Sequence, residues 1–265
     1  MSVTLKTSKP RLFSTVLDVI RRGRYIRTET FDFINDPDEY SLEILYDGEI
    51  ESYIASQDGI ILAYLNEIYG GADGLRTTRW VSTPYRNPKN QSAGKLLAAT
   101  LANTVDPYTA YWVVEFTSAT AFTLTSSLEG AQGTGATSAD LTSTSTELTI
   151  GTNAWSSVGE GFADNDKFYF SVVDVYQLVN KLSADLAAAA ALMERYSEAV
   201  PNANEYANKL YSNAMKLLDK LSDKDSPISL TSTMTYDLSS TAVDYNLGVL
   251  GEDKSSYLTS NDLDL

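Results

Sequence analysis

Histidine and cysteine are both absent from this chain of 265 residues. Without cysteine there is no disulfide, no thiolate nucleophile and no Cys-ligated zinc or iron–sulfur cluster. Without histidine there is no Ser-His-Asp triad and no His-ligated zinc or haem. Carboxylate, lysine or tyrosine chemistry and oxygen-ligated hard metals remain. The composition therefore lowers the expectation of an enzyme, and we predict no catalytic, cofactor-binding or metal-binding residue.

Long apolar runs are absent as well. No stretch approaches the ~20 apolar residues that cross a bilayer, and the first six residues lack the apolar core of a signal peptide. Hydrophobic residues nevertheless make up 43% of the chain, enough for a sizeable core. We expect a soluble, unsecreted protein without a membrane partner.

Charge is distributed unevenly, with a net value of −15. Residues 1–27 carry one acid, Asp18, against seven basic residues: Lys6, Lys9, Arg11, Arg21, Arg22, Arg24 and Arg27. This basic arm either folds back on the acidic body of its own chain or contacts a partner or packaged DNA. The acidic body argues against a dedicated nucleic-acid binder, because it repels phosphates.

Helical periodicity marks several segments. Apolar residues recur on one face over 48–70, 174–200 and 204–222, and a shorter helix is expected over 92–103. The short break between the last two long segments predicts an antiparallel helical hairpin.

The middle of the chain changes character, because no Lys or Arg occurs between Lys95 and Lys167. Alternating Val, Phe, Tyr and Thr predict strands over 111–116, 122–126, 148–150 and 168–173. The glycine-rich stretch 130–135 is interpreted as a wide loop, since its glycines fit neither a dinucleotide fingerprint nor a P-loop.

These patterns predict an α+β fold: a helical bundle core with an inserted small antiparallel β module and extended termini. Residues 1–108 would hold the basic arm and first helices, 109–173 the Ser/Thr-rich β module, and 174–223 the hairpin that completes the bundle. Residues 224–265 show no helical period but alternate over 228–236, so we expect an extended C-terminal assembly arm.

Two acidic clusters are candidate ligand sites. Asp36, Asp38 and Glu39 form one, and Asp164 and Asp166 form the other. Neither has the spacing of an EF-hand, so solvated turns are the favoured interpretation and weak calcium binding the alternative.

Two segments resemble tailed-bacteriophage head-to-tail adaptor (connector) proteins. The first is the signature helix, matched here by Ile61, Tyr64, Leu65, Tyr69 and Gly70. The second is a late helix followed by an extended segment at 227–230, matched by Leu210, Tyr211, Ala214, Leu217 and Leu218. Together these segments cover roughly a quarter of the chain, and the β module departs from small members of the family.

The resemblance implies a structural virion protein of the neck, made in the host cytoplasm. Such a protein forms a homo-oligomeric ring, typically of twelve copies, between the portal protein and the downstream neck or tail protein. A closed ring uses head-to-tail interfaces, and extended termini would reach neighbours or the portal. Packaged DNA would pass through the ring.

Two other functions stay open. The Ser/Thr-rich β module also fits another phage tail or capsid-decoration protein. A carboxylate-based hydrolase is the third alternative, although paired acids cannot be recognised without their separation.

Overall fold

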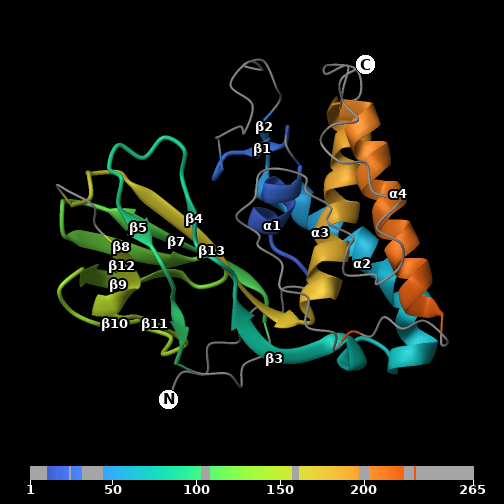
Figure 1. Cartoon of the computed structure of the whole chain (residues 1–265), viewed down its shortest axis with the longest axis horizontal. Coiled ribbons are helices and arrows are strands. Elements are labelled where there is room, and N and C mark those ends of the chain that lie inside the picture. The colour runs from blue at the N-terminus through green and yellow to red at the C-terminus, as the bar shows by residue number, and fades with distance from the viewer. Residues whose placement is uncertain are drawn as a thin grey trace, which may run out of the picture.

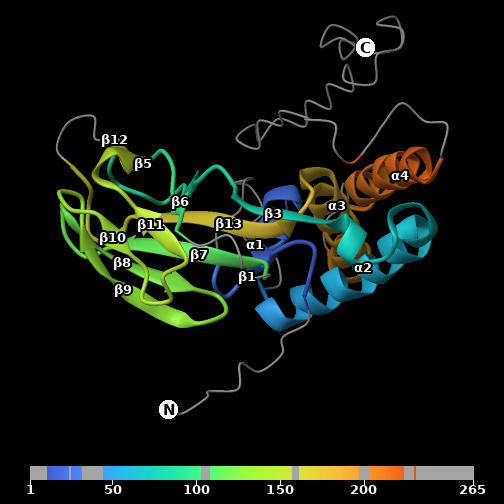
Figure 2. The same cartoon turned by 90° about the horizontal axis from the view of Figure 1, so that it is seen from below.

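The protein folds into a β half and a helical half that meet along one strand (Figure 1). The structure, a computed structural model, describes residues 11–23, 25–31, 44–102, 108–156, 161–196, 203–223 and 230. Most strands gather on one side, and α2, α3 and α4 lie on the other (Figures 1 and 2). Helix α1 lies between these two groups, with β1 and β2 beside it (Figure 1).

The β half is built on a six-stranded antiparallel sheet in the order β3-β13-β7-β8-β9, with β4 also pairing β13. Its strands are β3 (Arg76–Val81), β4 (Tyr85–Arg86), β7 (Ala110–Phe116), β8 (Ala121–Ser126), β9 (Gly130–Ala136) and β13 (Lys167–Val175). Period-2 alternation places Trp112, Val114 and Phe116 on one face of β7, and Tyr111 and Val113 on the other.

One face of this sheet is covered by two small sheets. These are β10 (Leu141–Thr142), β11 (Leu148–Ile150) and β6 (Thr100–Leu101), and β12 (Trp155–Ser156) paired with β5 (Lys95–Leu96). The space between them is filled by an aromatic core in which Phe116 stacks on Phe162 at 4.1 Å between ring centroids. Burial of this apolar area stabilises the β half as a sandwich.

The helical half has α3 (Gln177–Ala191) at its centre. Helices α2 (Asp47–Tyr69) and α4 (Ala203–Ser222) pack on α3 and on each other. Nearly every side chain of α3 is buried, and its alanines at 187–191 let the neighbouring helices approach closely. Gly70 ends α2 in the left-handed conformation (φ 75°), and α3 passes into a π-helical turn, Leu192–Tyr196.

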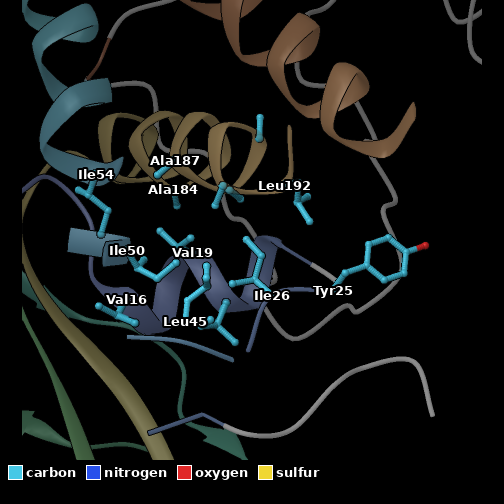
Figure 3. Close-up of a cluster of buried hydrophobic side chains, with 14 of the residues drawn as sticks. Val16, Val19, Tyr25, Ile26, Leu45, Ile50, Ile54, Ala184, Ala187 and Leu192 are labelled. Atoms are coloured by element: carbon cyan, nitrogen blue, oxygen red, sulfur yellow. The ribbon is translucent and has the colours of Figure 1, made fainter. Parts of the chain in front are cut away.

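Helix α1 (Val16–Arg22) packs between the halves. Thr15 and Asp18 form a capping box at its start. Its apolar side chains meet α2 and α3, as Val16, Val19, Ile50 and Ile54 show in Figure 3. The short parallel strands β1 (Arg27–Thr28) and β2 (Ile44–Leu45) close this core beside α1.

The expected fold class is wrong, because the β part of the protein is larger than expected relative to the helical part. The sheet is not a small module inserted into a bundle, because β3 and β4 precede residue 109 and pair with β13. Strand β13 is buried on both faces, and its Val173 and Val175 belong to the core of the helical half. The N-terminal part is not wholly an extended arm either, since residues 16–22 form a buried helix.

Two local predictions are also wrong. The expected helix over 92–103 is replaced by β5 and β6, where Leu96 is buried in the aromatic core and Leu97 is exposed. The expected loop over 130–135 is strand β9. A Cβ at Gly135 would lie 2.7 Å from the Phe122 ring, so glycine lets β9 pass close to that ring and to Leu141.

The long helices and the four strands expected from periodicity are confirmed, and most of their ends are shifted by a few residues. The helix expected over 174–200 begins at Gln177 and changes to a π-helical turn after Ala191. The acidic cluster at 36–39 and the strand over 228–236, except Leu230, lie outside the described residues.

We predict that Leu65→Asp lowers the free energy of unfolding by about 3–5 kcal/mol, because Leu65 is fully buried between the long helices and the new carboxylate would have no partner. Urea unfolding measures the change. Ala63→Asp is the matched control, since residue 63 is exposed on the same helix. Equal stability of the two variants would contradict the packing described above.

Candidate functional site

A buried polar cluster lies where α1, α2, α3 and β13 meet. We call it the polar junction, and its side chains come from Ser14, Thr15, Asp18, Asp58, Ser171, Asn180 and Ser183. All of them are less than a tenth exposed. Buried polar groups cost free energy unless they are hydrogen-bonded, so the contacts of this cluster decide what it does.

Asp18 ties α1 to the other elements. Its Oδ2 accepts hydrogen bonds from the Thr15 backbone N–H (2.9 Å) and from Asn180 Nδ2 of α3 (3.0 Å). Its Oδ1 accepts one from the Ser171 hydroxyl of β13 (2.8 Å). One carboxylate therefore links α1, the first turn of α3 and the strand that both halves share.

Asp58 makes the corresponding link to α2. The Phe13 backbone N–H donates to Oδ2 (2.8 Å), the Ser183 hydroxyl donates to Oδ1 (2.6 Å), and Ser183 also lies 2.8 Å from the hydroxyl of Ser14. Burial raises the pKa of Asp58 to about 7, although these hydrogen bonds and the charge of Arg76 favour the ionised form. Asp58 thus titrates near neutral pH.

A third carboxylate, Asp174, fixes the edge of the junction. Arg76 Nη1 lies 2.5 Å from Asp174 Oδ2, and the Thr109 hydroxyl donates to Oδ1 at 3.0 Å. The Arg76 guanidinium also lies over the Phe13 ring, 5.7 Å from its centroid. These contacts hold β3 against β13 and against the segment that leads into α1.

The polar junction holds the structural elements around it in fixed positions relative to one another. The oxygens of Asp18 and Asp58 are occupied by donors of the protein itself, and their side chains sit inside packed cores. Sequence reasoning missed both acids, yet one signal was present. Asp58 falls on the apolar stripe of α2 between Ile54 and Ile61, where a charged residue requires a buried partner.

A small basic cleft opens beside the junction, where the end of α1 meets β3 and the start of α3. It has a volume of about 80 Å³, and Arg22, Trp80, Thr83, Gln177 and Lys181 are among its lining residues. Arg22 and Lys181 both contact Asp185, which is fully buried.

Arg21 adds a third cation to the rim of this basic cleft. Its guanidinium donates to the Thr83 carbonyl oxygen at 3.4 Å and lies over the Tyr85 ring. Arg21 and Arg22 of the expected basic arm therefore fold back on their own chain, whereas Lys6, Lys9 and Arg24 lie outside the described residues.

The second acidic cluster from the sequence is structural. Asp166 accepts hydrogen bonds from the Ser92 side chain and from the backbone N–H groups of Gln91, Ser92 and Ala163. Burial alone would raise the pKa of Asp166, but these hydrogen bonds lower it below its usual value. The carboxylate pins the 90–92 loop to the start of β13.

Apolar side chains on the surface mark possible contact areas. In the part of the chain that the structure describes, the large exposed ones are Ile44, Tyr46, Tyr64, Leu97 and Tyr211. Tyr64 and Tyr211 project from α2 and α4, whereas Trp112 and Trp155 fill the aromatic core of the β half. Within the described residues, the large exposed aromatic side chains are therefore tyrosines of the helical half.

Among the described residues, no group of three or more Asp or Glu is placed to hold a metal ion. No helix in the part of the chain that the structure covers combines the length and apolar character of a membrane span.

Comparison with known proteins identifies no family. No family model matches the chain, and no curated protein matches it. Two crystal structures of Xanthomonas campestris FlgL match weakly. One aligns at 17% identity and a TM-score of 0.27 over 55% of this chain and 51% of FlgL. The other aligns at 16% and 0.27 over 74% and 68%. Likeness at this level carries no argument about fold or function.

We predict that Asp58→Asn removes a pH dependence of stability. The folded carboxyl holds its proton up to about pH 7 and the unfolded one only to 3.8, so the free energy of unfolding falls as pH rises between these values. Asparagine resembles the protonated acid and does not titrate. Relative to the native chain, the variant should gain about 2–3 kcal/mol between pH 5 and pH 8.

Urea unfolding at both pH values measures this difference. Glu67→Gln, at an exposed position of the same helix, is the control and should show little change in its difference from the native chain. A constant difference between Asp58→Asn and the native chain would contradict the raised pKa.

Proposed function

We propose that the chain is a structural virion protein, a head-to-tail adaptor that forms a ring between the portal and the tail of a tailed phage. The supporting observation is where the two resembling segments lie. They form α2 and α4, and their apolar residues occupy one core around α3: Ile61, Leu65, Ala214, Leu217 and Leu218. Segments about 150 residues apart in the chain thus form one structural unit.

Of the remaining residues of the resemblance, Tyr64 and Tyr211 lie on the surface, whereas Leu210 is buried and Tyr69 is partly buried. Tyr64 and Tyr211 are both exposed, at 40% and 41%. Tyrosine is enriched at protein interfaces because it combines a large apolar ring with a polar end. These two side chains supply contacts to neighbouring subunits in the proposed ring.

Gly59 supports contact on the outer face of α2. A glycine inside a helix costs about 1 kcal/mol relative to alanine. A Cβ at this position would meet no atom of the chain within 4 Å, so its own packing does not require glycine. Close approach of a neighbouring subunit to the helix backbone would explain why glycine occurs at this position.

The β half keeps a second candidate open, a tail or capsid-decoration protein. It is a sandwich with its own aromatic core, and it departs from the small members of the adaptor family. The hydrolase alternative gains nothing from Asp18 and Asp58, because protein donors occupy their oxygens.

The mass of the full chain in solution, alone and mixed with the portal protein, tests the proposal. We expect a closed ring of about twelve copies, or a monomer that becomes a ring on the portal. Tyr64→Arg with Tyr211→Arg should abolish assembly without changing thermal unfolding, and Thr125→Arg on the exposed face of β8 is the matched control. A chain that stays monomeric and does not bind the portal would contradict the adaptor function.

A further inference from the structure

Residues 11–15 precede α1 without forming a helix or a strand, and we call them the strap. Phe13 and Ser14 of the strap are nevertheless almost fully buried. Backbone groups of a buried segment need hydrogen-bond partners, and an irregular segment cannot obtain them from its own secondary structure. Side chains of other elements supply them, so these side chains determine whether the strap stays in place.

Three side chains bind the backbone of the strap. Asp58 of α2 accepts a hydrogen bond from the Phe13 N–H (2.8 Å), and Asn180 of α3 donates one to the Phe13 carbonyl oxygen (3.0 Å). Arg76 of β3 donates to the Arg11 carbonyl oxygen (3.4 Å). Burial raises the pKa of Asp58 to about 7, so the charge of this partner changes near neutral pH.

The hydroxyl groups beside Asp58 accommodate a proton without the loss of a hydrogen bond. Ser183 Oγ lies 2.6 Å from Asp58 Oδ1 and 2.8 Å from Ser14 Oγ. When Asp58 is ionised, the Ser183 hydroxyl donates to the carboxylate. When Asp58 is protonated, its carboxyl group donates to Ser183, whose own proton can turn toward Ser14. The protonated acid therefore keeps its contacts with α3 and the strap, and no negative charge is buried.

The charges that bear on Asp58 come from several elements. Arg76 of β3 favours the ionised form of Asp58, but Arg76 is itself paired with Asp174 of β13. Asp18 of α1 is linked to the strap through Asn180, which binds both.

The other packed elements add charges that are paired, exposed or distant. On α3, Lys181 and Asp185 pair with each other, and Arg11 of the strap is exposed. The nearest charged residues within α2 are Glu51 and Glu67, about two turns away on either side. The side chains that α4 adds to the core around Phe13 are apolar: Ala214, Leu217, Leu218 and Leu221.

We propose that the strap is a pH-sensitive latch, which a proton on Asp58 keeps closed and which opens when that proton is lost. Opening lets water reach the carboxyl group, which then ionises near its ordinary pKa of 3.8 instead of about 7. Opening therefore releases a proton, and the open fraction rises with pH between these two values. The latch belongs to a single chain and does not depend on the proposed ring.

Thiol labelling tests the latch, because the native chain has no cysteine. Val16→Cys places a buried thiol directly after the strap, and Ala187→Cys places one on α3 in the same core (Figure 3). Neither residue belongs to the polar junction. Each labelling rate is divided by the rate for the same variant unfolded in urea at the same pH, which removes the effect of pH on the thiol itself.

We expect the corrected rate for Val16→Cys to rise by at least about tenfold from pH 5 to pH 8. Low concentrations of urea should not change it, because a local opening exposes little surface. Ala187→Cys should label at least about tenfold more slowly at pH 8 and should respond to urea. Adding Asp58→Asn to Val16→Cys should remove the rise with pH, whereas adding the exposed Glu67→Gln should preserve it.

Equal rates and equal urea dependence for the two thiols would overturn the proposal, because the whole core would then open together. A rate for Val16→Cys that does not change with pH would also overturn it, as would a rise that survives Asp58→Asn. Hydrogen exchange of residues 11–15 in the native chain, corrected for the intrinsic rate at each pH, applies the same criteria without a new thiol.

Discussion

The hydrogen bonds of Asp18 and Asp58 are the constraint on which the rest of the structure depends. Each carboxylate is held inside a packed core, where its desolvation must be offset by donors in fixed positions. Those donors come from α1, α3 and β13 for Asp18, and from α3 and the segment before α1 for Asp58. Because these donors come from separate elements, the junction ties the orientations of α1, α2 and α3 to one another and to β13.

The two halves are joined because strand β13 contributes residues to the cores of both. Strand β13 contributes Phe168, Phe170 and Val172 to the aromatic core, and Val173 and Val175 to the helical core. Ser171 lies between Phe170 and Val172 in the strand, and its hydroxyl donates a hydrogen bond to Asp18. If the chain forms the proposed ring, such a subunit would suit it, since a closed ring needs a constant angle between successive interfaces.

The periodicity of apolar residues correctly predicted those helices and strands whose apolar face is the face that packs in the folded protein. The helix over 48–70 and the strands over 111–116 and 168–173 have apolar faces that pack as their spacing requires. The periodicity gave the wrong secondary structure where pairing with residues distant in the sequence determines it. Leu96, Leu97 and Leu101 fit a helical period, but pairing with Trp155 and Leu148 makes their segments strands. The sequence offered one signal for the polar junction, Asp58 on the apolar stripe of α2, but not its partners, because residues such as Asp18 and Ser171 are separated by more than 150 positions.

Denaturant unfolding followed by two probes tests the coupling of the halves most directly. Trp112 and Trp155 report by fluorescence on the core of the β half, whereas Trp80 packs against the helical core. Far-ultraviolet circular dichroism reports mainly on the helices. The account predicts coincident transitions for the native chain, as expected of one cooperative unit. It predicts that Asp18→Ala lowers both midpoints and separates them, whereas Thr142→Ala on the surface does neither. Separate transitions in the native chain, or an Asp18→Ala variant that unfolds like the native chain, would contradict the central role of the junction.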